Sequence, residues 1–234
     1  MPLPKLDTPT YSLVLPSTGQ TIKYRPFLVK EQKIMMMAQE SEEDNQMYQV
    51  MSDVVKSCTF DEINTETSPI FDIEYIFLKL RSKSVGETTT VRLLCPDDKK
   101  TYAQVEVNLE DLEVQMTENH TNVIKLTDTI KLIMKYPLLK DMKTITNANS
   151  GEQVFSIVKH CIHEVHDGDK VYNRIDITDK DIEEFMDSMN TEQLQMVLDF
   201  FQTMPKIRHP VIVTNPKTKV QSEVVIEGMN SFLA

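Results

Sequence analysis

Alternating apolar and polar residues near the start of the chain predict a β-hairpin. Apolar side chains recur at every second position in residues 11–15 and 21–24, on either side of Pro16-Ser17-Thr18-Gly19. A period of two places these side chains on one face of a strand, and Pro and Gly between two such runs favour a turn. The hairpin is expected to end at Pro26.

Helical periodicity follows from about Leu28 to Cys58, and a polar interruption from Ser41 to Gln46 indicates two helices rather than one. Pro69 opens the next predicted helix, at a position where its missing N–H is not needed. Apolar residues lie on every side of this helix, which is typical of a central, largely buried helix. One stripe on it consists of Ile73, Ile76, Phe77 and Leu80.

The period returns to two in residues 88–109, and again in residues 211–226 at the end of the chain. Each run is broken by a turn that contains proline, so each predicts a hairpin. Val91-Arg92-Leu93-Leu94-Cys95-Pro96 aligns with Val211-Ile212-Val213-Thr214-Asn215-Pro216. Two explanations stay open: two related halves, each of helices followed by a hairpin, or a chance likeness between short hairpins.

Between these hairpins, strands are predicted at Val123–Leu126 and Ile130–Tyr136, and a third at Val171–Ile177. A helix follows the loop Asn147–Gly151 and is expected to end at Gly168. Its apolar stripe consists of Val154, Phe155, Val158, Cys161, Ile162 and Val165. Phe155 and Ile162 should therefore be almost fully buried. Two further helices are expected, capped by Thr178 and by Asn190 or Thr191.

These elements predict an α+β protein in which helices pack on small antiparallel hairpin sheets. The polar break at Asn119–Asn122 marks a boundary between two lobes. Residues 1–119 would form an N-terminal lobe of hairpin, helices and hairpin. Residues 120–234 would form a C-terminal lobe of strands, three helices and a hairpin.

Composition narrows the class of function. The formal net charge is −11, and the Lys and Arg residues are scattered, so nucleic acid and anionic membranes are not expected partners. No apolar run approaches the roughly 20 residues that span a bilayer, and the N-terminus has no signal-peptide core. Three widely spaced Cys residues are typical of reduced thiols in a cytoplasm.

A histidine-rich segment, His160 to Asp167, is one candidate for chemistry. His and Cys bind zinc, and two His residues four apart on a helix can share one metal ion. Here the histidines His160, His163 and His166 are three apart, which is one residue short of the H-E-x-x-H pattern. A polar helix face is the first interpretation, with His163 on the surface. A small metal-dependent hydrolase built on the His160–His166 helix is the alternative.

The turn Cys95-Pro96-Asp97-Asp98 is the second candidate. A zinc-ribbon turn has two thiolates three positions apart, but here the second position is Asp98. The aligned turn has Asn215 and Thr218 at the matching positions, so one of four thiolates is present. No metal is expected. The thiols of Cys58 and Cys161 lie on apolar helix stripes, where they are expected to be inert. No catalytic, cofactor-binding or metal-binding residue is assigned, and no enzyme activity is expected.

The run Met35-Met36-Met37 covers most of the circumference of a helix, so the three side chains cannot all face one core. Methionine is flexible and polarizable, which suits a surface that adapts to a partner. Ordinary core filling is the alternative, since methionine at helical spacing is usually buried.

Several segments together resemble the baseplate hub proteins of T-even-type myophages. These are Met1–Tyr11, Leu15–Gly19, Tyr24–Glu31, Ile130–Pro137 and Met229–Phe232. The resemblance covers most of the chain and consists of structural signatures. It implies a non-enzymatic protein that binds other baseplate hub and tail proteins in the contractile-tail baseplate, inside the infected cell. It leaves open whether the protein stays in the virion.

The predicted binding surfaces are the edges of the hairpins at residues 88–109 and 211–226, the Met35–Met37 helix surface, and the terminal Phe232-Leu233. A homo-oligomer is compatible with the same pattern. A cytoplasmic adaptor or inhibitor unrelated to tails is a further alternative of the same binding class.

Overall fold

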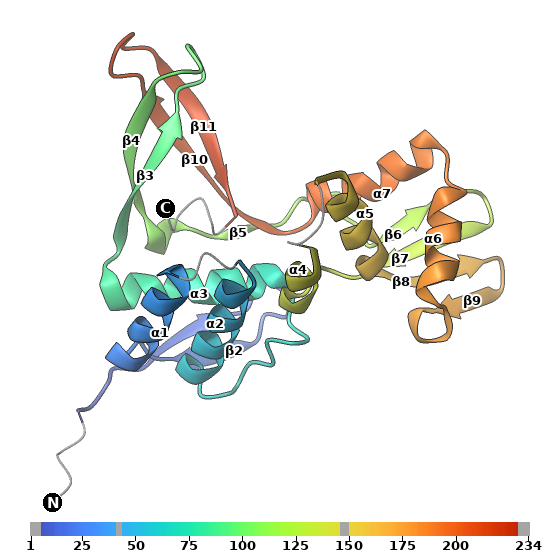
Figure 1. The fold of residues 1–234 in the computed structure, drawn as a ribbon, viewed down its shortest axis with the longest axis horizontal. Helices are drawn as coiled ribbons and strands as arrows, with labels where there is room; N and C mark the ends of the chain where they lie inside the picture. The colour runs from blue at the N-terminus through green and yellow to red at the C-terminus, as the bar shows by residue number, and fades with distance from the viewer. Residues whose placement is uncertain (1–5, 41–43, 146–149, 229–234) are drawn as a thin grey trace, which may run out of the picture. The chain divides into compact units, whose positions relative to one another are not determined.

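The computed structural model describes residues 6–40, 44–145 and 150–228. It confirms the α+β class, with helices packed beside small antiparallel sheets (Figure 1). The chain forms two compact units, and the second is inserted into the first. The first unit comprises Met1–Gln115 and Lys206–Ala234, and the second comprises Met116–Pro205.

This grouping differs from the lobes 1–119 and 120–234 in two respects, of which the first is that the division falls after Gln115. The C-terminal hairpin belongs to the same unit as the N-terminal segments, because it pairs with a strand that ends at Gln115. The lobe boundaries themselves stay a prediction.

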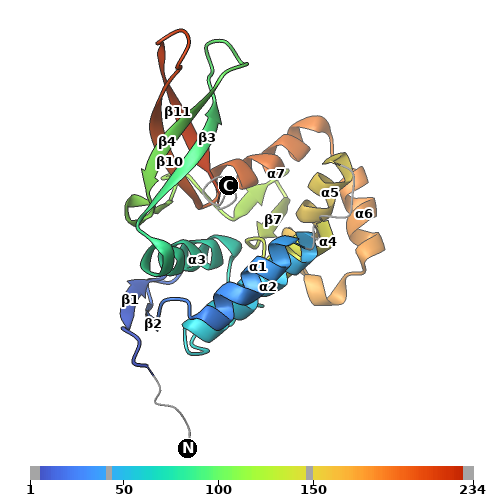
Figure 2. The ribbon, with the colours of Figure 1, turned by 60° about the vertical axis from the view of Figure 1, so that its left-hand side comes forward.

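In its described residues, the first unit contains three α-helices and three hairpins. Its elements are β1 (Tyr11–Val14), β2 (Thr21–Tyr24), α1 (Val29–Glu40), α2 (Asp44–Cys58), α3 (Ile70–Val85), β3 (Thr88–Leu94), β4 (Tyr102–Asn108), a 3-10 turn (Leu109–Asp111), β5 (Val114–Gln115), β10 (Lys206–Thr214) and β11 (Gln221–Glu227). Strands β1 and β2 pair, as do β3 and β4, while β10 lies between β11 and β5. Figures 1 and 2 show hairpins β3–β4 and β10–β11 side by side.

Helix α3 forms the centre of the first unit, as the sequence predicts. Its stripe is buried, and so are Phe71 and Leu78 on its other sides, while Tyr75 is partly buried and Val85, at the end of the helix, is exposed. Its buried polar groups have partners: Ser17 donates to Asp72, and the Lys79 ammonium donates to the carbonyl of Glu110 at 2.6 Å. These bonds offset the cost of removing the charges from water.

The turns of the three hairpins have the same backbone pattern. In each turn, the N–H of the fifth residue donates a hydrogen bond to the carbonyl of the first residue. These bonds run from Gly19 to Leu15, from Lys99 to Cys95, and from Lys219 to Asn215. Each of these fifth residues has a positive φ, between 51° and 71°. Proline is second in all three turns. Because three hairpins share this geometry, the likeness between the two later hairpins is not specific to two related halves, and that duplication stays a prediction.

The second unit is a four-stranded antiparallel sheet with helices packed against it (Figure 1). Its elements are β6 (Val123–Lys125), β7 (Ile130–Met134), α4 (Leu139–Ile145), α5 (Ser150–Cys161), β8 (Ile162–Asp167), β9 (Lys170–Asn173), a 3-10 turn (Arg174–Asp176), α6 (Asp179–Asp187) and α7 (Thr191–Thr203). Its core joins Leu132 and Met134 of the sheet to Val158, Ile182 and Phe200 of the helices. Thr178 caps α6, as predicted, and of the two candidates Asn190 and Thr191 it is Asn190 that caps α7; both caps form complete capping boxes.

The prediction of one helix from the loop at 147–151 to Gly168 is wrong. Helix α5 ends at Cys161, and the next six residues form strand β8. Val165 pairs with Leu132, and Ile162 pairs with Met134, so these apolar residues face the core from a strand. Their sequence spacing fits either element, and only the pairing with β7 distinguishes the two. The predicted strand 171–177 is likewise shorter, since residues 174–176 form a 3-10 turn.

Candidate interaction surfaces

The histidines of the segment His160 to Asp167, expected on one helix, do not share a helix. His160 is on the last turn of α5, where its Nδ1 lies 2.8 Å from the carbonyl of Ser156. His163 and His166 are on β8, and His166 contacts the Glu164 carboxylate at 2.8 Å. The donor set of the hydrolase alternative is therefore divided between a helix and a strand. Among the described residues, no group of three His, Cys, Asp or Glu side chains is arranged to hold a metal ion.

All three thiols are buried. Burial raises the pKa of Cys58 to about 11 and that of Cys161 to about 12, and it also raises the pKa of Cys95. A thiolate is the form that attacks an electrophile or binds a metal, and burial disfavours it here.

The two turns that were compared with a zinc ribbon, which begin at Cys95 and Asn215, contact each other. Asp97 of the first accepts hydrogen bonds from Asn215 at 2.9 Å and from Thr218 of the second.

Helix α1 has its apolar side chains on the outside. Val29, Met36 and Met37 are 81%, 56% and 61% exposed, and Ile34 is exposed as well. The side that faces the first unit carries Glu31 and Ala38 instead. This arrangement is the reverse of an ordinary surface helix, whose apolar stripe faces the core. We call Val29, Ile34, Met36 and Met37 the α1 face. Core filling by Met36 and Met37 is thereby excluded, and Met35 is partly buried.

A buried ion pair fixes the start of α1. The Arg25 guanidinium donates to the Glu31 carboxylate at 2.8 Å, and the Ser57 hydroxyl donates to the same oxygen at 2.8 Å. The second carboxylate oxygen accepts the N–H of Leu28. Burial alone would raise the pKa of Glu31, but these hydrogen bonds and the Arg25 charge lower it to about 2. These hydrogen bonds hold the start of α1, and with it the α1 face, in place against α2.

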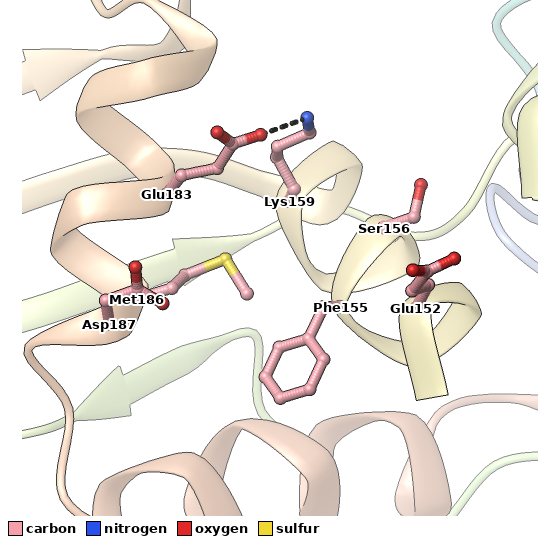
Figure 3. A pocket seen from close by; sticks show the side chains of 7 residues that line it. All are labelled: Glu152, Phe155, Ser156, Lys159, Glu183, Met186 and Asp187. Atoms are coloured by element: carbon pink, nitrogen blue, oxygen red, sulfur yellow. Dashed lines mark hydrogen bonds and ion pairs between the residues drawn. The ribbon is translucent and has the colours of Figure 1, made fainter. Parts of the chain in front are cut away.

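The second unit has an apolar cavity of about 630 Å³ between α5 and α6. Figure 3 shows the Phe155 ring and the Met186 side chain pointing toward each other across it. Lys159 and Glu183 form an ion pair at 2.8 Å on its border. Phe155 is 50% exposed, so the prediction that it lies in the core is wrong, whereas Ile162, at 0%, is buried as predicted.

Comparison with protein families decides the class of this protein. A family model described as T4 bacteriophage base plate protein matches residues 8–234. The chain belongs to this family. Searches of curated proteins and of solved structures found no match.

Membership makes the chain a structural base plate protein of a phage tail. This agrees with the resemblance found in the sequence at the level of the base plate. None of its described helices has the length and hydropathy needed to cross a bilayer. For a base plate protein, exposed apolar side chains on a rigid support are candidate contacts with neighbouring subunits.

Sequence patterns located only part of these surfaces. The Met35–Met37 run indicated the α1 face, but the cavity between α5 and α6 was missed because Phe155 fitted the predicted stripe. One signal was present: Val154 and Phe155 are adjacent, and adjacent helix positions point about 100° apart, so both cannot occupy the centre of one narrow stripe. Both are exposed. The terminal Phe232-Leu233 lies outside the described residues.

Proposed function

We propose that this base plate protein is a non-enzymatic component or assembly factor of the contractile-tail baseplate hub, and that it acts by binding other hub and tail proteins. The partners are proteins, not nucleic acid or membrane. Assembly takes place in the host cytoplasm, and the product is the tail baseplate. The α1 face carries the proposal, because it places four large apolar side chains on one exposed helix.

Two properties make the α1 face suited to a protein partner. Met36 and Met37 can adjust their conformation to a neighbouring surface at small cost. The anchor through Glu31 holds the helix start in place, so docking need not order it. Burying a methionine side chain contributes about 1.5–3 kcal/mol, so two of them can contribute much of the affinity of a hub contact.

The test uses phage-infected cells that express a tagged chain. Met36→Gln/Met37→Gln keeps side-chain length and helix propensity but removes the apolar surface. Hub and tail proteins identified by mass spectrometry should co-purify with the tagged wild-type chain, and the double variant should recover them at roughly a tenth of that level or less.

The matched control is Met116→Gln/Met196→Gln, which changes two exposed methionines of the second unit. It should recover the same tail proteins as the wild-type chain, and both variants should melt at the wild-type temperature. Equal recovery with the α1 variant would overturn the proposal, as would recovery of host proteins alone. If only a second copy of this chain is recovered, the α1 face is a self-association surface and the hub contact lies elsewhere.

A further inference from the structure

A groove of about 660 Å³ lies beside the ends of the two long hairpins of the first unit. Residues from β3, from the start of β4 and from the turn between β10 and β11 line it. Figure 2 shows the two hairpins running together toward this end. The groove is separate from the α1 face, and its lining is polar and basic rather than apolar.

Three cations line the groove, and no carboxylate does: Arg92, Lys100 and Lys217. None of the three forms an ion pair with another described residue. The Arg92 guanidinium lies 4.4 Å from the centre of the Tyr102 ring, so the ring fixes the position of the charge. In a chain of net charge −11, such a cluster is a local reversal of sign.

Two carboxylates in the adjoining turn are already occupied. Asp97 accepts from Asn215 and Thr218, and Asp98 accepts from the hydroxyl and N–H of Thr101 and from the N–H of Lys100. These bonds hold both carboxylates within the turns. Among the described residues, no carboxylate therefore forms an ion pair with the three cations, and Arg92 contacts the Tyr102 ring.

The wall formed by β4 also presents main-chain groups. Strand β4 pairs only with β3 among the described strands, and Tyr102 to Gln104 of β4 line the groove. An unpaired strand edge offers N–H and C=O groups to an extended partner segment. Strand β10 packs beside β4 without pairing with it. The groove thus combines positive charge with main-chain groups of β4 that no described strand pairs on that side.

We propose that this groove binds an acidic, extended segment of a partner protein, whose carboxylates pair with Arg92, Lys100 and Lys217. Nucleic acid suits the surface less well. A polyphosphate carries one charge per roughly 1.7 Å of duplex and needs a continuous basic track. Here Asp97 and Asp98 adjoin the three cations, and the whole chain is acidic. A protein segment with a few spaced carboxylates matches three separated cations.

The experiment uses the purified full-length chain and fluorescein-labelled peptides. A peptide of alternating Glu and Ser should bind, and its affinity should fall as NaCl increases. Arg92→Gln/Lys100→Gln/Lys217→Gln should weaken binding roughly tenfold or more, because the carboxylates lose their partners. Lys100→Gln/Lys217→Gln leaves the Arg92–Tyr102 contact intact and should still weaken binding, which separates lost charge from a disturbed hairpin.

A triple control makes the same change of net charge elsewhere. Lys23→Gln/Lys131→Gln/Lys170→Gln alters three exposed lysines outside the groove and should keep the wild-type affinity. Equal weakening by both triple variants would mean a general charge effect and would overturn the proposal. The proposal would also fail if the Glu-Ser peptide did not bind, or if an oligothymidylate bound more tightly than the peptide. These measurements involve no tail protein, so they are independent of the co-purification test of the α1 face.

Discussion

The Glu31 carboxylate accepts a hydrogen bond from the Arg25 guanidinium at 2.8 Å inside the first unit, with the side chain of Glu31 only 4% exposed. This pair joins the strand β2 end to helix α1, and Ser57 extends the network to α2. The buried Glu31 carboxylate of α1 thus faces the protein, while the four residues of the α1 face are exposed. The stability of the α1 support should therefore depend on one carboxylate.

Glu31→Gln should lower the free energy of unfolding by about 3 kcal/mol, because it leaves the Arg25 charge buried without its counter-charge. Urea denaturation at neutral pH measures this. Glu223→Gln, at an exposed position on β11, should change stability by less than about 0.5 kcal/mol. A loss that is no larger for Glu31→Gln than for this control would mean that the pair contributes nothing measurable.

The same carboxylate predicts a dependence on pH. Its pKa is about 2 in the folded chain, below the usual value near 4.5, so the folded state favours the ionised form. The resulting stability is present above the unfolded pKa and is lost as pH falls through the window from about 4.5 to about 2. The difference between wild type and Glu31→Gln should narrow across that window. Denaturation curves from pH 7 down to pH 3 test this, and a constant difference would contradict it.

Two apolar substitutions near the end of α5 should have unequal effects. Ile162→Ala should cost about 3 kcal/mol, because Ile162, the first residue of β8, is fully buried in the core where the sheet packs against the helices. Phe155→Ala should cost about 1 kcal/mol or less, since half of its surface is already in water. Chemical denaturation of both variants measures the two losses of unfolding free energy. An equal or larger loss for Phe155→Ala would place that ring in the core after all.

The third hairpin turn should be improved by glycine at its fifth position. Lys219 has a φ of 64°, a conformation that disfavours residues with a Cβ, and its N–H bond to Asn215 does not depend on the side chain. Lys219→Gly should raise the unfolding free energy by about 1 kcal/mol. Lys217→Gly, two residues earlier in the same turn, should give no gain, because its φ is not positive. Thermal melts compare the two.

The contact between the two long hairpins should depend on Asn215. Its side chain donates to Asp97 and accepts the N–H of Lys217, and the residue is buried. Asn215→Ala should cost about 1–3 kcal/mol. Asn215→Asp should cost more at pH 7, since two carboxylates would then meet, and part of that extra loss should be regained as the pH is lowered toward 4. If the two variants are equally stable at every pH, the side chain does not face Asp97.

Local sequence patterns determined much of the architecture. The period of two predicted all three hairpins of the first unit, and apolar residues on every side predicted the buried α3. Thr178 was recognisable as a cap, and the second cap was narrowed to Asn190 or Thr191, because a capping residue acts on an N–H only a few positions away. These features depend on neighbours in the chain, so the sequence alone contains them.

The remaining features were decided by partners distant in sequence. Residues 162–167 form a strand because β7 supplies hydrogen bonds to them, although their spacing continues the helical stripe of α5. Asp97 and Asn215 meet only when two hairpins 118 residues apart pack together. The α1 face lies outside because Arg25 and Ser57 bind Glu31 and hold that carboxylate inward. Periodicity identifies which side chains share a face, but only tertiary packing and long-range hydrogen bonds determine which face is buried.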